Sequence, residues 1–363
     1  MMSNYNGSNF SIVCSMLRDG LQDGILSLQQ TALVYISPFA VILNSAVIYY
    51  LIMNKLFNKN FKLLLGSLSF FNIIFTCSVL INGVRLLTFY SHNPCDLIMT
   101  FYLCSKINSL VVATVIVIPF TLLALSIERL CASILYRQYD DMKSAALPAT
   151  LLAFVLIMTL VVVLPAFIQD PLPDELALRS CDSIIIKNYG SSLYKVLLIV
   201  SAESISMFIF IYIHFSDRKK YHIFTINQAA NRLKIRYQLT FNIQVNKALL
   251  PSTLVGVPCY TIGNLFMFAS STAMYKEQKV YSNFVIILAT IFSILQPMIL
   301  FWCNKWFKEP LSKDMNRIFK FLVQSRMKNK VGGAERGAAI NIDNKKADQT
   351  TVKYFDDLDK MWN

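Results

Sequence analysis

The sequence predicts an all-α membrane protein, built as a bundle of seven membrane-spanning helices. Hydrophobic residues make up 55% of the 363 residues and charged residues only 15%, whereas a soluble domain carries about 25% charged residues. The mean hydropathy is +0.50. The apolar residues also gather in segments long enough to cross a bilayer, for which roughly 20 residues are needed.

Seven segments meet this length requirement. In lipid, every backbone N–H and C=O group needs a partner within its own segment, so we expect each segment to be a helix rather than a strand. In chain order they are 31–53, 63–83, 103–127, 145–168, 191–215, 248–271 and 281–303.

The two ends of the chain lie outside these segments. Residues 1–30 are polar and mixed, without the regions of a cleavable signal peptide, so we expect the first apolar segment to act as the insertion signal. Across 304–327, apolar residues recur every three or four positions with Lys and Arg between them, which predicts a short amphipathic cytoplasmic helix on the membrane surface. Residues 328–363 have the composition of a disordered tail.

The positions of Lys and Arg orient the bundle. With the N-terminus outside, the inner connections and the tail hold 26 of the 34 Lys/Arg residues, and the outer segments hold 6. Without the tail, the comparison is still 13 against 6. Because positive residues favour the cytoplasmic side, we expect an extracellular N-terminus. The net charge of +13 then reflects topology rather than a nucleic-acid partner.

Two further features agree with this orientation. Asn6 and Asn9 each begin an Asn-x-Ser sequon, and both lie in the N-terminal segment, so we expect glycans on the outer side. The outer connection 169–190 is acidic, as the asymmetry of positive charge predicts.

The cysteines fall into two groups in this topology. Cys14, Cys95, Cys104 and Cys181 lie outside, where disulfide bonds form. A Cys104–Cys181 bridge would hold the connection 169–190 over the bundle, and Cys14–Cys95 would be the second bridge. Four cysteines allow three pairings, so the connectivity stays open. The others are expected to be free thiols, and the Cys and His spacing predicts no metal site.

The third apolar segment ends with an acidic and a basic residue, Glu128 and Arg129. An ionisable pair at the inner mouth of a helix touches headgroups and the inner cavity, so it costs far less there than at mid-bilayer. Such a pair is either an interfacial anchor that reaches the headgroups or a functional element.

Seven helices, an extracellular N-terminus, Cys104 at the outer end of the third helix and Glu128-Arg129 at its inner end resemble a G-protein-coupled receptor. The resemblance implies a bundle of that receptor type, in which Glu128 restrains Arg129 in the inactive state. It also implies that Arg129 contacts the G protein once it is released. Leu130 stands where the family usually has an aromatic residue.

A narrower resemblance rests on two stretches, "SIERLCASILYRQYD" (126–140) and "LKIRYQLTFNIQVNKALLPSTLV" (233–255). They are similar to the nematode serpentine chemoreceptors, most closely class AB, with class alpha as the close alternative. Members carry an E-R motif followed by a Tyr-acid pair, here Tyr139-Asp140, and an R-Y-Q-x-x-E-N stretch before the sixth helix. Phe241 stands where Glu is usual. The residues that match this second motif are Arg236, Tyr237, Gln238 and Asn242.

The connection 216–247 is strongly basic, with Asp217 as its only acid. This charge either anchors the segment to anionic lipid or also forms a docking surface for a G-protein α subunit, and both can hold. The receptor resemblance places the docking surface on a set of basic and aromatic residues: Arg137, Arg232, Lys234, Arg236 and Tyr237.

Ionisable and polar residues within the spans are candidates for a ligand pocket. Glu203 lies near mid-membrane, where a lone charge is costly and is a functional candidate by default. Protonation, or hydrogen bonds to Ser204 or Ser206, would also accommodate it. Lys106 and Lys195 either line a pocket for an anionic ligand or extend to the headgroups. The candidate pocket residues are Lys106, Asn108, Lys195, Glu203, Tyr260 and Asn264.

Pro258 and Pro297 lie within the sixth and seventh segments, where each removes a backbone hydrogen bond and can kink its helix. Pro is also common in membrane helices for reasons of packing alone. By analogy with receptor bundles, we expect these two to let the inner helix ends swing.

The sequence thus predicts a chemosensory G-protein-coupled receptor in the plasma membrane, which we expect in sensory neurons. A small molecule would bind the outer half of the bundle and shift it to a state that activates a heterotrimeric G protein. The alternative is a multi-pass transporter or a ligand-gated channel. Clustered catalytic residues at membrane depth are lacking, so neither an enzyme nor a cofactor is expected.

Overall fold

The computed structural model describes residues 24–54, 57–90, 101–135, 146–168, 189–226, 233–272 and 275–330. All regular secondary structure in these ranges is α-helical. Seven of the described helices are long and apolar enough to cross a membrane, and a further helix follows them. The predicted seven-helix, all-α fold class is therefore confirmed. Several residues with predicted roles lie outside the described residues: Asn6, Asn9, Cys14, Cys95, Arg137, Cys181 and Arg232.

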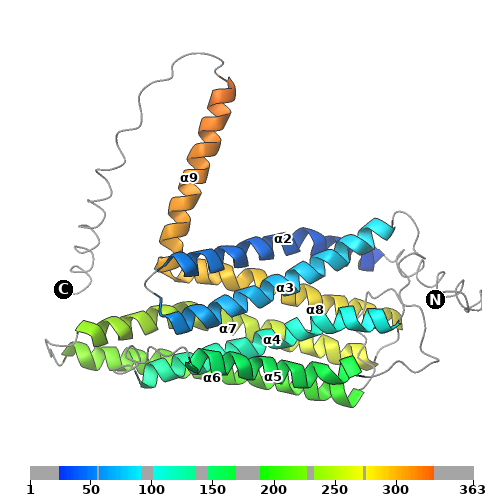
Figure 1. The fold of residues 1–363 in the computed structure, drawn as a ribbon, viewed down its shortest axis with the longest axis horizontal. Helices are drawn as coiled ribbons and strands as arrows, with labels where there is room; N and C mark the ends of the chain where they lie inside the picture. The colour runs from blue at the N-terminus through cyan, green and yellow to red at the C-terminus, as the bar shows by residue number, and fades with distance from the viewer. Residues whose placement is uncertain are drawn as a thin grey trace, which may run out of the picture. The chain divides into compact units, whose positions relative to one another are not determined.

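The helices that make up the bundle run side by side, with consecutive ones antiparallel (Figure 1). Their apolar character and length follow from the bilayer. Its hydrocarbon offers no hydrogen-bond partners, and a helix pairs its backbone N–H and C=O groups within itself. The bounds are α2 Gly24–Met53, α3 Lys59–Tyr90, α4 Phe101–Ile134, α5 Ala146–Ile168, α6 Tyr189–Ile226, α7 Leu233–Thr272, α8 Tyr275–Cys303 and α9 Lys305–Lys330.

Helix α4 is the central element of the bundle. It packs against α3, α5 and α6, while α7 packs against α6 and α8, and α2 packs against α3 and α8. In α4, 72% of the most apolar window is buried, against 22% in α5. A polar side chain on α4 is therefore enclosed by protein on nearly all sides.

The bundle buries polar side chains and exposes large apolar ones. Asn44, Asn72 and Gln296 are at most 1% exposed, whereas Phe39 and Phe208 are each 64% exposed. This distribution suits a lipid environment, where apolar side chains face the hydrocarbon and polar groups pair between helices. The chain is a multi-pass membrane protein.

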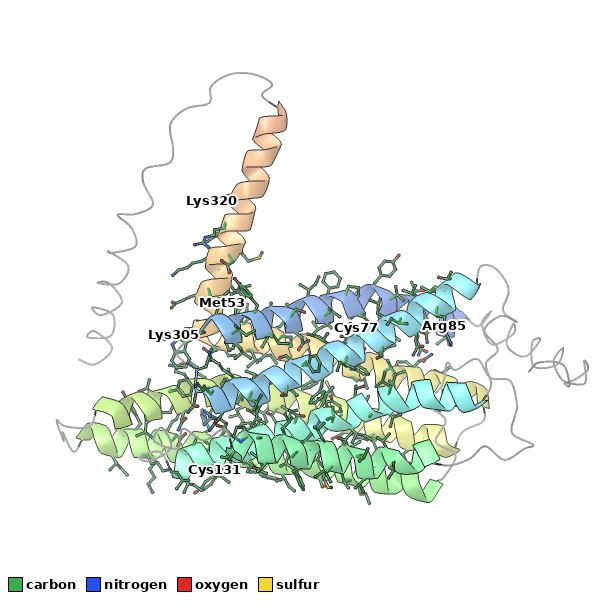
Figure 2. All side chains as sticks on the ribbon, viewed as in Figure 1. Met53, Cys77, Arg85, Cys131, Lys305 and Lys320 are labelled. Carbon is green, nitrogen blue, oxygen red and sulfur yellow. The ribbon has the colours of Figure 1, made fainter. Side chains whose placement is uncertain are left out.

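The two ends of the bundle carry different residues. Met53, Cys131 and Lys305 lie at one end, whereas Arg85 lies at the opposite end (Figure 2). Because Cys131 is two residues from Arg129, we name the first of these the Arg129 end.

Asn304 separates α8 from α9. Its Oδ1 accepts a hydrogen bond from the backbone N–H of Trp306 at 2.9 Å, which is the bond that caps a helix N-terminus. The chain divides into two compact units after Leu311, so the first turns of α9 belong with the bundle. The described part of the second unit continues the helix and carries an exposed ion pair, Asp314–Arg317, at 3.6 Å.

Candidate functional site

Glu128 and Arg129 occupy consecutive positions near the end of α4 and contact each other directly. Arg129 Nε and Nη2 donate to separate carboxylate oxygens of Glu128, each at 2.5 Å. The side chains are 1% and 0% exposed. A buried carboxylate and guanidinium need each other, because an unpaired charge away from water is very costly. An interfacial anchor would extend to the surface of the bundle, whereas this pair is buried inside it.

Arg129 also joins α4 to two other helices. Its Nη1 donates to Asn242 Oδ1 on α7 at 3.4 Å, and Asn242 Nδ2 donates to the carbonyl oxygen of Ala132 at 3.3 Å. The guanidinium lies over the ring of Phe61 on α3, 4.9 Å from the centroid, and 5.9 Å from that of Phe241 on α7. A desolvated cation–π contact contributes about 2 kcal/mol. One side chain thus holds three helices together.

Phe61 and Phe241 pack with three further aromatic rings. We name these five rings the aromatic cap: Phe57, Phe61, Phe241, Trp306 and Phe307. Phe241 stacks on Trp306 at 5.3 Å, and Phe57 stacks on Phe307 at 5.1 Å. Phe57 precedes α3, Phe61 lies in the first turn of α3, Phe241 lies on α7, and the other two rings lie in the first turn of α9. Phe241, a departure from the family motif in the sequence, is thus one of the two cap rings that contact Arg129.

A second polar cluster surrounds Asp217, a fully buried residue of α6. Ser133 Oγ on α4 donates to its carboxylate, and Asn246 Nδ2 on α7 donates to it at 3.4 Å. Lys220 Nζ lies 4.0 Å from the carboxylate and donates to the Ser133 carbonyl oxygen at 2.8 Å. This Asp217 cluster ties α4, α6 and α7 together at the Arg129 end.

The sequence analysis missed the Asp217 cluster, although two spacings point to it. Ser133 lies four positions after Arg129, and Asn246 lies four positions after Asn242. Residues four apart share one helix face, so both partners of Asp217 lie on faces already singled out by the motifs. That α6 also approaches these faces is visible only in the fold.

A third network crosses the middle of the bundle. Asn72 on α3 donates to Gln296 Oε1 on α8 at 2.8 Å and accepts from Ser293 Oγ at 3.1 Å. Asn44 Nδ2 on α2 donates to the Ser293 carbonyl oxygen at 2.8 Å. All four side chains are buried. The network fastens α2, α3 and α8 immediately beside Pro297, which lies within α8.

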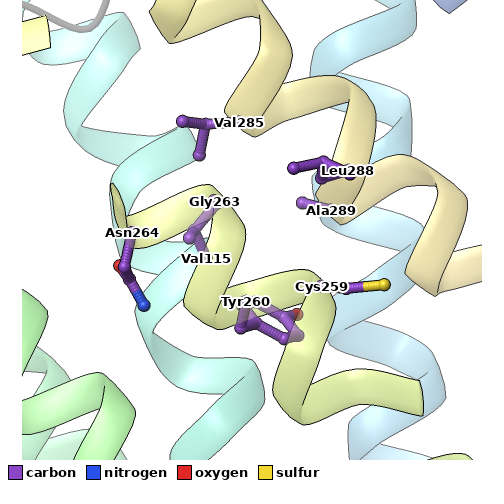
Figure 3. A pocket seen from close by; sticks show the side chains of 8 residues that line it. All are labelled: Val115, Cys259, Tyr260, Gly263, Asn264, Val285, Leu288 and Ala289. Carbon is purple, nitrogen blue, oxygen red and sulfur yellow. The ribbon is translucent and has the colours of Figure 1, made fainter. Parts of the chain in front are cut away.

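A small cavity lies between α4, α7 and α8, on the far side of this network from Arg129. Figure 3 shows the α7 residues Tyr260 and Gly263 facing the α8 residues across the cavity. It has room for about one water molecule. The lining residues are Val115, Cys259, Tyr260, Gly263, Asn264, Val285, Leu288 and Ala289.

Two of the predicted pocket residues, Tyr260 and Asn264, therefore come together at this cavity. Glu203 on α6 is 2% exposed and interacts electrostatically with Tyr260 and with Cys259. The alternative that a serine holds Glu203 is wrong for this packing, because neither carboxylate oxygen has a hydrogen-bond partner among the described residues. Ser206 instead donates to a backbone carbonyl of its own helix.

The remaining predicted site residues are not part of these clusters in the described part of the chain. Pro258 lies within α7, directly before the lining residue Cys259. Some predicted residues lie in described helices but have side chains outside the described part of the chain: Cys104, Lys106 and Asn108 in α4, Lys195 in α6, and Lys234, Arg236 and Tyr237 in α7. No three His, Cys, Asp or Glu side chains gather as metal ligands within the ranges that the structure describes.

Two comparisons place these features among known proteins. A family model described as the serpentine type 7TM GPCR receptor class ab chemoreceptor matches residues 11–325. The chain is also similar to serpentine receptor class alpha/beta-14 of Caenorhabditis elegans, with 23% identity over 348 residues, which cover 91% of this chain and 87% of the relative.

Proposed function

Because the chain belongs to the serpentine class ab chemoreceptor family of seven-transmembrane G-protein-coupled receptors, we propose that it converts the binding of a small molecule into activation of a heterotrimeric G protein. The observation that supports this most is the buried, bidentate Glu128–Arg129 pair beneath the aromatic cap. We place the Arg129 end in the cytoplasm and the N-terminus outside, in the plasma membrane of a sensory neuron.

In the proposed inactive state, Arg129 is fully occupied. Its guanidinium is bonded to Glu128 and Asn242 and is covered by Phe61 and Phe241. A G-protein α subunit can reach Arg129 only if the aromatic cap opens, which requires α7 to move away from α3. The cap and the Asp217 cluster thus oppose activation together with Glu128.

The proposed ligand site lies far from the Glu128–Arg129 pair. Tyr260 follows Asn242 by eighteen residues on α7, which corresponds to about 27 Å along the helix axis. Pro251 and Pro258 lie between the two sites, within the helix. A ligand that favours one of two helix packings needs no direct contact with Arg129, because α7 itself connects the sites.

The proposed docking surface for the α subunit surrounds the end of the bundle where Arg129 lies. It uses the residues expected from the sequence: Arg137, Arg232, Lys234, Arg236 and Tyr237. The positive charge of its Arg and Lys residues matches the positive-inside orientation and would also attract anionic lipid. Family membership favours the receptor over the transporter or channel that the sequence left open.

The test is ligand-independent G-protein activation by the full chain in cells. Glu128→Gln keeps the shape of the side chain but removes its negative charge and leaves a single oxygen to accept from Arg129, which should shift the equilibrium toward the active state about tenfold. Arg129→Ala should abolish activation. Glu309→Gln makes the same change at an exposed position of α9 and is the matched control.

Surface expression must be equal for all four proteins. Unchanged activation in both Glu128→Gln and Arg129→Ala, across a panel of α subunits, would contradict the proposed switch. Ionic current through the wild type without any G protein would then support the channel alternative.

A further inference from the structure

Glu203 differs from the other buried acids of the described chain. Glu128 is neutralised by Arg129, and Asp217 receives hydrogen bonds from Ser133 and one further side chain. Glu203 is equally enclosed, yet both of its oxygens lack a partner among the described residues. An unpaired carboxylate within a membrane bundle is costly, so it marks a place where a partner from outside the chain would bind.

Two side chains that line the cavity also carry a buried polar atom without a partner among the described residues. Tyr260 and Asn264 are each 6% exposed, and within the described residues the Tyr260 hydroxyl and Asn264 Nδ2 have no hydrogen-bond partner. They lie four positions apart on one face of α7, and both line the cavity. Glu203 acts electrostatically on Tyr260 and on Cys259, which also lines it.

The polar groups around the cavity select for positive charge. The lining holds a phenol and an amide and no basic side chain; the Glu203 carboxyl group is not itself part of the lining but interacts electrostatically with the lining residues Tyr260 and Cys259. An anion would face the Glu203 carboxyl group, whereas an N–H cation could donate to it and to the phenol oxygen. The remaining wall is apolar, with Val115, Val285 and Leu288. We propose that the ligand is a small protonated amine whose ammonium group pairs with Glu203; this rests on the proposed receptor function.

The size of the cavity links binding to movement. With room for about one water molecule, the cavity cannot admit an organic amine unless Tyr260 shifts or α7 parts from α8. The Tyr260 ring packs edge-to-face on Phe292 of α8, with centroids 5.1 Å apart. An amine that displaces Tyr260 therefore pushes on the contact between these two helices, and binding favours a different packing of the bundle.

The experiment measures binding separately from signalling. The purified full chain in detergent is heated with n-butylamine or cyclohexylamine, with the size-matched neutral compounds butan-1-ol or cyclohexanol, and with sodium chloride alone. We expect the amines to raise the melting temperature and the alcohols and sodium to leave it unchanged. Glu203→Gln should weaken amine binding by about tenfold or more, because the ion pair with the ammonium group becomes a hydrogen bond to an uncharged amide oxygen. Glu309→Gln should bind amines as the wild type does.

Other outcomes would overturn the proposal. Equal stabilisation by the alcohols would show an apolar site, saturation by sodium would show a site for an inorganic cation, and undiminished amine binding by Glu203→Gln would remove the carboxylate from the site. If Glu203→Gln does not fold, Asn264→Ala is used instead, and the same melting experiment measures amine binding after the loss of a polar side chain that lines the cavity. Amine binding without G-protein activation would contradict only the proposed function, whereas activation of a chain that binds no amine would contradict only this inference.

Discussion

Gly256→Ala is expected to destabilise the contact between α7 and α8. A Cβ atom at Gly256 would lie 2.7 Å from Phe292 Cε2 and 3.1 Å from Cζ, closer than side chains pack. Phe292 is fully buried, and its ring rests edge-to-face on Tyr260. Because the ring is enclosed and packed on Tyr260, it must shift against its neighbours or the two helices must move apart.

Gly263 provides a matched control on the same helix. A Cβ atom there would lie 3.9 Å from Val285 Cγ1, which is ordinary van der Waals contact. Replacing Gly by Ala within a helix stabilises both variants by about 0.5–1 kcal/mol, and this contribution cancels when they are compared. Overpacking costs about 1–3 kcal/mol, so Gly256→Ala should be less stable than Gly263→Ala by that amount.

The assay is the melting temperature of the purified variants in one detergent. Gly263→Ala should melt at or above the wild-type temperature, and Gly256→Ala should melt below both. Adding Phe292→Leu to Gly256→Ala should recover part of the loss, because contacting residues are not additive. Equal melting of the two alanine variants would refute the argument, since Phe292 could then not lie against Gly256.

Three further predictions concern the other clusters and the topology. Asn72→Ala removes hydrogen bonds to α2 and α8 and leaves their buried polar groups unpaired, so we expect a loss of about 1–3 kcal/mol in stability; an unchanged melting temperature would contradict this. Phe241→Leu removes the ring whose centroid lies 5.9 Å from the Arg129 guanidinium. This is near the limit of about 6 Å for a cation–π contact, so the loss is about 1 kcal/mol rather than about 2, which corresponds to roughly fivefold higher basal G-protein activation; lower activation would contradict the proposed restraint of Arg129. Asn6→Gln combined with Asn9→Gln should remove a glycan from the expressed chain, visible as faster migration on a gel, and identical migration would argue against an extracellular N-terminus.

The fold class was accessible from the sequence because the bilayer imposes it residue by residue. A segment that must pair its own backbone groups in hydrocarbon has to be apolar and helical over a fixed length. These requirements are local, so they appear directly in the hydropathy of segments such as 103–127. The E-R motif at the end of that segment was equally visible, and with it the resemblance to the family.

The contacts of the motif residues were not accessible in this way. Neighbours along a helix point in different directions, so the sequence does not show that Arg129 and Glu128 form a bidentate pair. Their burial depends on α3, α7 and the start of α9 closing over α4. Phe241 stands where the family motif usually has Glu, and only the structure shows that its ring lies over the guanidinium.

The same division holds for the cavity. Sequence reasoning proposed Glu203, Tyr260 and Asn264 as polar residues within spans, because any such residue is costly there. It could not tell which of them would find partners, since hydrogen bonds between helices depend on rotation and crossing. By itself the sequence determined the number of spans, the charge asymmetry and the chemically unusual positions. Only the packing of α4, α6, α7 and α8 decided that Asp217 is satisfied and that Glu203 is not.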